Sequence, residues 1–158
     1  MKRIMILWVA LGVIYVAIEI LWRGHSHISM LVVGGLCGVL VGAVNQIPVF
    51  YRLPIIAQSI IGASIVLLVE FFSGCILNLW LGLNVWDYSD QIGNIAGQVC
   101  LLYAFLWVFL MPFAIWAEDT AHWLIYSWEK LLGRMPRQSP MYEPYTLLKI
   151  YKDFFTGK

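Results

Sequence analysis

Residues 55–79 read IIAQSIIGASIVLLVEFFSGCILNL, an apolar run with a single charged side chain, Glu70. A helix needs roughly 20 apolar residues to cross a bilayer, so this run predicts a transmembrane helix. Similar runs extend from Ile4 to Trp22, from Ile28 to Val49 and from Gly93 to Ala117. With 61% hydrophobic residues and a mean hydropathy of +0.81, the chain is too apolar for a soluble globular domain. We therefore predict an all-α membrane protein, built as a bundle of four transmembrane helices.

The Lys and Arg residues divide unevenly between the two ends of these helices. In a four-span topology nine of the ten fall on one side: Lys2, Arg3, Arg52, Lys130, Arg134, Arg137, Lys149, Lys152 and Lys158. Arg23 falls on the other side, where the loop from Leu81 to Ile92 carries Asp87 and Asp90 with no Lys or Arg. Because cytoplasmic loops carry the excess of Lys and Arg, we predict that both termini are cytoplasmic and that the membrane is the bacterial cytoplasmic membrane.

The chain after the fourth span is predicted to stay at the cytoplasmic surface. In this scheme residues 1–118 form the transmembrane domain, and residues 119–158 form a cytoplasmic region. The stretch from His122 to Leu132 mixes Trp, Tyr and Leu with charged residues, which is typical of an amphipathic helix at the inner interface. Three prolines between residues 136 and 144 then predict an extended linker. The short basic end from Tyr145 to Lys158 is a candidate helix.

Glycines are spaced to let neighbouring helices approach closely. Gly34, Gly38 and Gly42 recur every four residues in the second span, and Gly93 and Gly97 open the predicted fourth span. In lipid, small residues at this spacing allow helix backbones to approach until dispersion holds them together. Both stretches are therefore predicted to be helix contacts.

Glu70 is the most informative residue within the predicted spans. Ala63 precedes it by seven residues, and Gly74 and Asn78 follow it by four and eight, so one helix face is small and polar. A carboxylate that faces lipid costs several kcal/mol, and this face is therefore expected to meet protein or water. Two interpretations stay open: Glu70 binds a solute, an ion or a proton, or it is a protonated group hydrogen-bonded to a neighbouring helix.

Other polar side chains are predicted to gather around Glu70 in the outer half of the bundle. Glu19 precedes Arg23 by four residues, which is the spacing of a local ion pair. Such an ion pair, without any binding role, is also the simplest explanation for the presence of both residues. Trp86 and Tyr88 flank an acid after the third span, although interfacial anchoring would explain these aromatics equally well. An outward-facing polar cleft is predicted from these residues. Its candidate binding residues are Glu70, Glu19, Arg23, Asn78, Trp86, Asp87, Tyr88 and Gln98.

Metal and cofactor patterns are sparse. His25 and His27 flank Ser26 in the outer turn and are candidate metal ligands if a third ligand comes from elsewhere. Cys37, Cys75 and Cys100 occur singly, so we expect them to be small apolar core residues without a disulfide. No cofactor is predicted, and the charge distribution gives no support for nucleic-acid binding.

Several segments resemble a known family. LVEFFSGCILN at 68–78, LNVWDYS at 83–89 and GQVCL at 97–101, together with Trp107, are similar to the ABC-transporter type IV family, or CmpB-like permeases. The vertebrate transmembrane protein 229 group resembles the same segments. The resemblance covers about residues 15–120, and the family name implies transport. Because the 158 residues contain no GxxxxGK[ST] phosphate loop, an ATPase would have to be a separate subunit.

The function predicted from these observations is that of a permease-like membrane protein rather than an enzyme. It is expected to bind a small polar solute, cation or proton around Glu70. It is expected to act as a homodimer or another small oligomer, because four helices rarely enclose both gates of a transport path. One alternative is a binding or regulatory membrane subunit without transport activity. The other is a small metal-dependent membrane enzyme that uses His25, His27 and a carboxylate.

Overall fold

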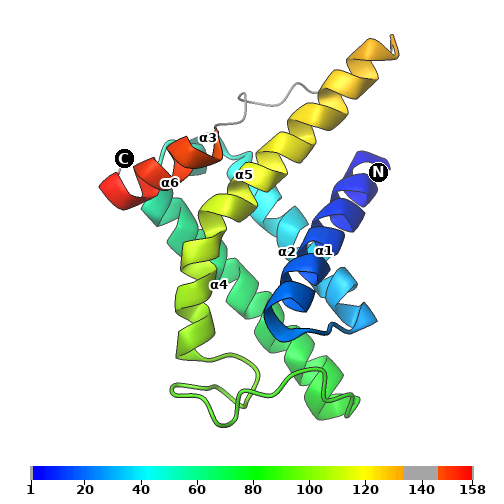
Figure 1. The fold of residues 1–158 in the computed structure, drawn as a ribbon, viewed down its shortest axis with the longest axis vertical. Coiled ribbons are helices and arrows are strands. Elements are labelled where there is room, and N and C mark those ends of the chain that lie inside the picture. The colour runs from blue at the N-terminus through cyan, green and yellow to red at the C-terminus, as the bar shows by residue number, and fades with distance from the viewer. Residues whose placement is uncertain (1, 134–145, 158) are drawn as a thin grey trace.

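The computed structural model describes residues 2–133 and 146–157, and these ranges are helical without a named strand (Figure 1). The long helices are α1 (Lys2–Arg23), α2 (Ile28–Asn45), α4 (Ile55–Gly74), which continues into the π-helical segment η1 (Cys75–Trp80), and α5 (Leu101–Leu131). The short helices are α3 (Pro48–Tyr51) and α6 (Leu147–Thr156). Four segments are long and apolar enough to cross a membrane, which confirms the predicted four-span fold: Ile4–Arg23, Ile28–Asn45, Ile55–Trp80 and Leu101–Leu131.

Glycines allow α1 and α2 to pack as a close antiparallel hairpin (Figure 1). A Cβ atom on Gly34 would overlap the side chain of Tyr15, and one on Gly38 would lie 2.6 Å from Leu11 Cδ1. On the α1 side, a Cβ atom on Gly12 would overlap the Leu31 carbonyl. The predicted close contact along the glycines of the second span is therefore confirmed.

The apolar core lies between α2, α4 and α5, and α6 contributes to it. Its buried members are Val33, Cys37, Val41, Ile55, Ala63, Val66, Met111, Ile115 and Ile150. Ile150 of α6 is 1% exposed, and the Tyr151 hydroxyl donates to the Phe109 carbonyl at 3.1 Å. The basic end of the chain thus contains the predicted helix, which packs against the bundle instead of extending from it. The linker predicted around Pro136, Pro140 and Pro144 lies outside the described residues.

The fourth span begins later than predicted, at Leu101 and not at Gly93. Gly93 and Gly97 lie in the loop before α5, with φ angles of 68° and 69°. Such positive φ angles are incompatible with a right-handed helix, so the prediction of a helix contact at these two glycines is wrong. The loop conformation is what brings Gln98 back toward the end of the third span.

Helix α5 extends beyond Ala117, where the fourth span was predicted to end. Residues 122–131, predicted as an interfacial helix, are helical but continue α5 without a break. The helix changes direction near its middle, and it contains Pro112, which removes one backbone hydrogen bond (Figure 1). The second span, by contrast, ends earlier than predicted, at Asn45, because Pro48 begins the separate helix α3.

Candidate functional site

A cavity of about 450 Å³ lies among α1, α2, α4 and α5. Helices α1 and α5 supply most of its wall, and α2, α4 and Tyr88 of the loop before α5 supply the rest. Leu21, Trp22 and Phe109 belong to the wall and are exposed, so the cavity opens to the surface of the chain beside α1 and α5. The wall is largely aliphatic and aromatic, in contrast to the polar cleft predicted from the sequence. The difference arises because several of the predicted polar residues bond to one another in the outer loop.

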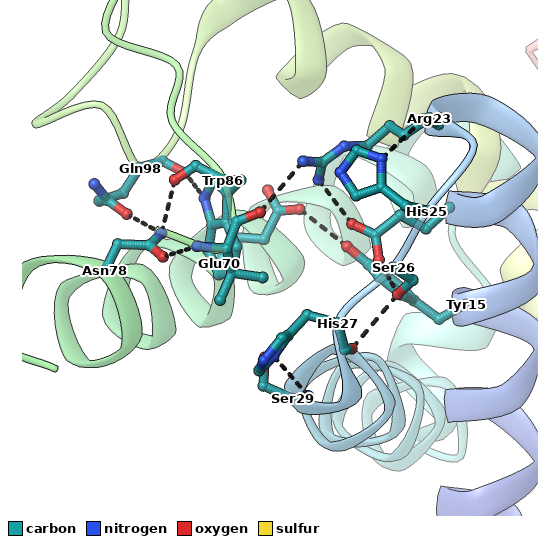
Figure 2. Close-up of polar contacts among 12 residues, drawn as sticks. Tyr15, Arg23, His25, Ser26, His27, Ser29, Glu70, Asn78, Trp86 and Gln98 are labelled. Atoms are coloured by element: carbon teal, nitrogen blue, oxygen red, sulfur yellow. Dashed lines mark hydrogen bonds and ion pairs between the residues drawn. The ribbon is translucent and has the colours of Figure 1, made fainter. Parts of the chain in front are cut away.

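Glu70 lines this cavity from the buried face of α4. Its side chain is 4% exposed, and the Tyr15 hydroxyl donates to Oε1 at 3.5 Å, the outer limit of a hydrogen bond (Figure 2). The indole of Trp107 lies beside the same carboxyl group. Among the described residues, Oε2 has no hydrogen-bond partner, and no ion pair involves Glu70. The carboxyl group is therefore buried, weakly bonded and next to open space.

Glu19 and Arg23 line the same cavity as a formed ion pair, which confirms the local pairing expected from their spacing. Arg23 Nη1 donates to Glu19 Oε1 at 2.8 Å, and the Ser26 hydroxyl donates to Glu19 Oε2 (Figure 2). Arg23 Nη2 also donates to the Val85 carbonyl at 3.3 Å. This cation therefore compensates Glu19 and connects the end of α1 to the loop that follows η1.

Asn78, Trp86 and Gln98 form a buried network that holds the loop between η1 and α5 (Figure 2). Asn78 Nδ2 donates to the Trp86 carbonyl at 2.9 Å and to Gln98 Oε1 at 2.8 Å, and Asn78 Oδ1 accepts from the Val85 amide at 2.7 Å. Trp86 Nε1 donates to the Gln98 carbonyl at 3.0 Å. Trp86 is thus buried, not anchored at the interface. Of the described residues that line the cavity, none belongs to this network.

Asp87 and Tyr88 are adjacent in sequence but occupy different environments. Asp87 is exposed, and the hydroxyl and amide of Ser89, which donate to it, hold the pKa of Asp87 below its usual value. Tyr88 lines the cavity and stacks on Tyr103, with ring centroids 4.5 Å apart. Burial, and then the nearby Glu70, raise the pKa of Tyr88. Only Tyr88 of this predicted pair borders the space around Glu70.

The two histidines of the outer turn have local structural roles. His27 is the N-cap of α2, and its Nδ1 accepts from the Ser29 amide at 3.2 Å. His25 Nδ1 lies 3.1 Å from the Arg23 carbonyl. Within residues 2–133 and 146–157, no group of three or more His, Cys, Asp or Glu side chains is arranged to hold a metal ion. The predicted third ligand for these histidines is therefore not found in that part of the chain.

A sequence model of one protein family matches residues 4–136, a range that includes all four spans and the loop network. The chain belongs to the family described as "Putative ABC-transporter type IV". This description suggests a transporter-like membrane protein and agrees with the four apolar helices. No match was found among curated proteins or among solved structures. The likeness to the vertebrate transmembrane protein 229 group stays a prediction.

Sequence reasoning missed Tyr15 of this ABC-transporter type IV chain, and it singled out Trp107 only as part of the family resemblance. Tyr15 of α1 and Trp107 of α5 stack with centroids 5.7 Å apart, and both lie beside Glu70. Both spans are apolar on every side, so no pattern separates the rings that face the cavity from those that face outward.

A second polar cluster of the same chain lies where the end of α2 meets α5. Asn45 Nδ2 donates to Glu118 Oε2 at 3.3 Å and to Asp119 Oδ1 at 2.8 Å. His122 Nδ1 lies 2.8 Å from Glu118 Oε1. A Cβ atom on Gly42 would lie 2.6 Å from Glu118 Oε1, so the glycine makes room for this buried acid. The cluster ties α2 to α5 near the inner end of the bundle.

Proposed function

We propose that this chain is a permease-like membrane protein that binds a small solute, cation or proton at Glu70. One observation supports the proposal above the others: a buried carboxyl group with an unpartnered oxygen lines a cavity of about 450 Å³. Leaving a buried polar atom without a partner costs roughly 1–3 kcal/mol, and of such side-chain atoms among the described residues, Glu70 Oε2 is the one whose residue lines the cavity. Acids within membrane spans commonly mark substrate, ion or proton pathways.

A purely structural role for Glu70 is disfavoured by its contacts. A carboxyl group retained for stability is expected to be well hydrogen-bonded on both oxygens. Glu70 Oε1 instead has one bond at 3.5 Å, and Oε2 has none among the described residues. The open space beside the carboxyl group provides room for a ligand to supply the missing contact.

A membrane subunit that works with a partner is the second candidate function. The family description refers to an ABC transporter, but the 158 residues contain no GxxxxGK[ST] phosphate loop. In this version both termini are cytoplasmic, the chain assembles as a homodimer or with a second membrane subunit, and a separate ATPase supplies the energy. Copurification of a nucleotide-binding protein with the chain, lost on removing the cytoplasmic end, would favour it.

Ion flux in proteoliposomes tests the leading proposal. The vesicles contain K⁺ and a pH-sensitive dye, and the external cation is either Na⁺ or choline. Added valinomycin lets K⁺ leave, and the resulting inside-negative membrane potential drives cations inward. The parent protein is expected to change the internal pH signal relative to empty vesicles under at least one condition, and Glu70→Gln is expected to abolish the change. Asp90→Asn is the matched control, because it removes an exposed acid of the outer loop. Full signal from folded Glu70→Gln, or no protein-dependent signal under either condition, would overturn the proposal.

A further inference from the structure

The ionisable residues of the cavity wall indicate the charge of its ligand. Among the described residues, the Asp, Glu, Lys, Arg and His side chains in the wall are Glu19, Arg23 and Glu70. Arg23 pairs with Glu19 at 2.8 Å, and Ser26 occupies the other oxygen of Glu19. The wall therefore presents one acid without a compensating cation, Glu70, and the complementary ligand carries one positive charge.

Aromatic rings are concentrated beside that acid. The stacked pair Tyr15 and Trp107 joins α1 to α5 next to Glu70, and the stacked pair Tyr88 and Tyr103 lines the same cavity. The faces of such rings attract cations, and the attraction increases when water is excluded. A carboxylate beside aromatic faces binds organic cations, whose positive charge is spread over several atoms, more readily than it binds strongly hydrated metal ions.

The remainder of the wall and its opening indicate the body of the ligand. Away from Glu70 the wall is formed by side chains such as Leu11, Leu110 and Phe113. The exposed wall residues Leu21, Trp22 and Phe109 lie within segments long and apolar enough to span a membrane, so the opening borders the region that lipid would occupy. A ligand that fills this space needs an apolar body and access through the hydrocarbon region.

We propose that the Glu70 cavity binds an amphipathic organic monocation, in which a protonated amine, quaternary ammonium or phosphonium is joined to an aromatic or alkyl body. This inference rests on the proposed function and specifies its substrate class. A small inorganic cation would leave the apolar wall unfilled. A lipid acyl chain would fill the wall but leave Glu70 uncompensated.

Equilibrium dialysis of purified protein in detergent tests the inference, with tetraphenylphosphonium as the cationic probe and triphenylphosphine oxide as its neutral analogue. The parent is expected to bind the cation saturably and the neutral analogue much more weakly. Glu70→Gln is expected to bind the cation at least about tenfold more weakly, because it removes a desolvated charge partner. Glu70→Asp keeps the charge and should retain part of the affinity. Asp90→Asn should bind like the parent, and thermal unfolding verifies that each variant is folded.

Three results would overturn the inference. They are the absence of saturable binding of the cation, binding of the cation by folded Glu70→Gln as tight as by the parent, and binding of the neutral analogue as tight as that of the cation. The last of these would identify an apolar pocket for lipid chains. The proteoliposome measurement separates this inference from the proposed function. A Glu70-dependent pH signal without tetraphenylphosphonium binding would reject only the ligand class, whereas the absence of any protein-dependent pH signal would reject the proposed function as well.

Discussion

Asn78 and Glu70 lie eight residues apart on one face of the third span, but the hydrogen bonds of their side chains differ. The difference distinguishes a residue that stabilises the fold from one that binds a ligand. Asn78 donates two hydrogen bonds at 2.8 and 2.9 Å and accepts one at 2.7 Å. Glu70 accepts one bond at 3.5 Å and has a second oxygen without a partner among the described residues. Both side chains are buried. A buried polar group with all its bonds made stabilises the fold, whereas one with unmet bonds beside a cavity indicates a binding site.

The largest expected loss of stability comes from replacing Asn78, the residue whose hydrogen bonds are all made. Asn78→Leu leaves the Val85 amide and Gln98 Oε1 without their partner, so the free energy of unfolding should fall by about 3 kcal/mol. Thermal unfolding in detergent measures the loss. Gln91→Leu is the control, because it adds the same side chain at an exposed position of the loop after η1 that has no positive φ angle. Equal midpoints for the two variants would show that the network does not hold the loop.

A smaller loss is expected at the α1–α2 contact, which forms one wall of the cavity. Gly38→Leu would force new atoms against Leu11, which lies 2.6 Å from the position of a Cβ atom, at a cost of about 2 kcal/mol. Ala43→Leu adds the same side chain at an exposed position of α2 and should change stability little. Gly24 is a poor control for this purpose, because its φ of +77° strains any other residue. Unchanged stability of Gly38→Leu would contradict the close contact.

Single-cysteine labelling tests the proposed orientation of the chain in the membrane. In a background lacking Cys37, Cys75 and Cys100, Asp90→Cys should react with an impermeant thiol reagent added to intact cells, because the network loop is proposed to lie outside. Arg137→Cys should react only after the membrane is opened, because the excess of Lys and Arg on its side is proposed to be cytoplasmic. The reverse pattern would invert the topology.

The parts of this molecule that the sequence predicts are those set by local patterns. Four apolar runs predict four spans, the spacing of Glu19 and Arg23 predicts their ion pair, and glycines four residues apart predict a close helix contact of the second span. Each of these depends on residues close in sequence or on composition alone.

The parts that the sequence does not predict depend on residues far apart in the chain. Gly93 to Cys100 has the glycine spacing of a helix contact, but its positive φ angles and its bonds to Asn78 and Trp86 show it to be a loop. The aromatic pair of Tyr15 and Trp107 is equally hidden, because α1 and α5 are apolar on all sides. That Glu70 lacks partners is likewise a property of the packed bundle.

The unfolding midpoint of Glu70→Leu, measured beside that of Asn78→Leu, tests the central claim most directly. Leucine removes the carboxyl group at similar volume, and it breaks the 3.5 Å bond from Tyr15 and the contact with the Trp107 indole. If Glu70 is retained for binding, Glu70→Leu should unfold at the same temperature as the parent or higher, while binding of tetraphenylphosphonium is lost. A fall in the midpoint as large as that of Asn78→Leu would contradict the account and make Glu70 a structural residue.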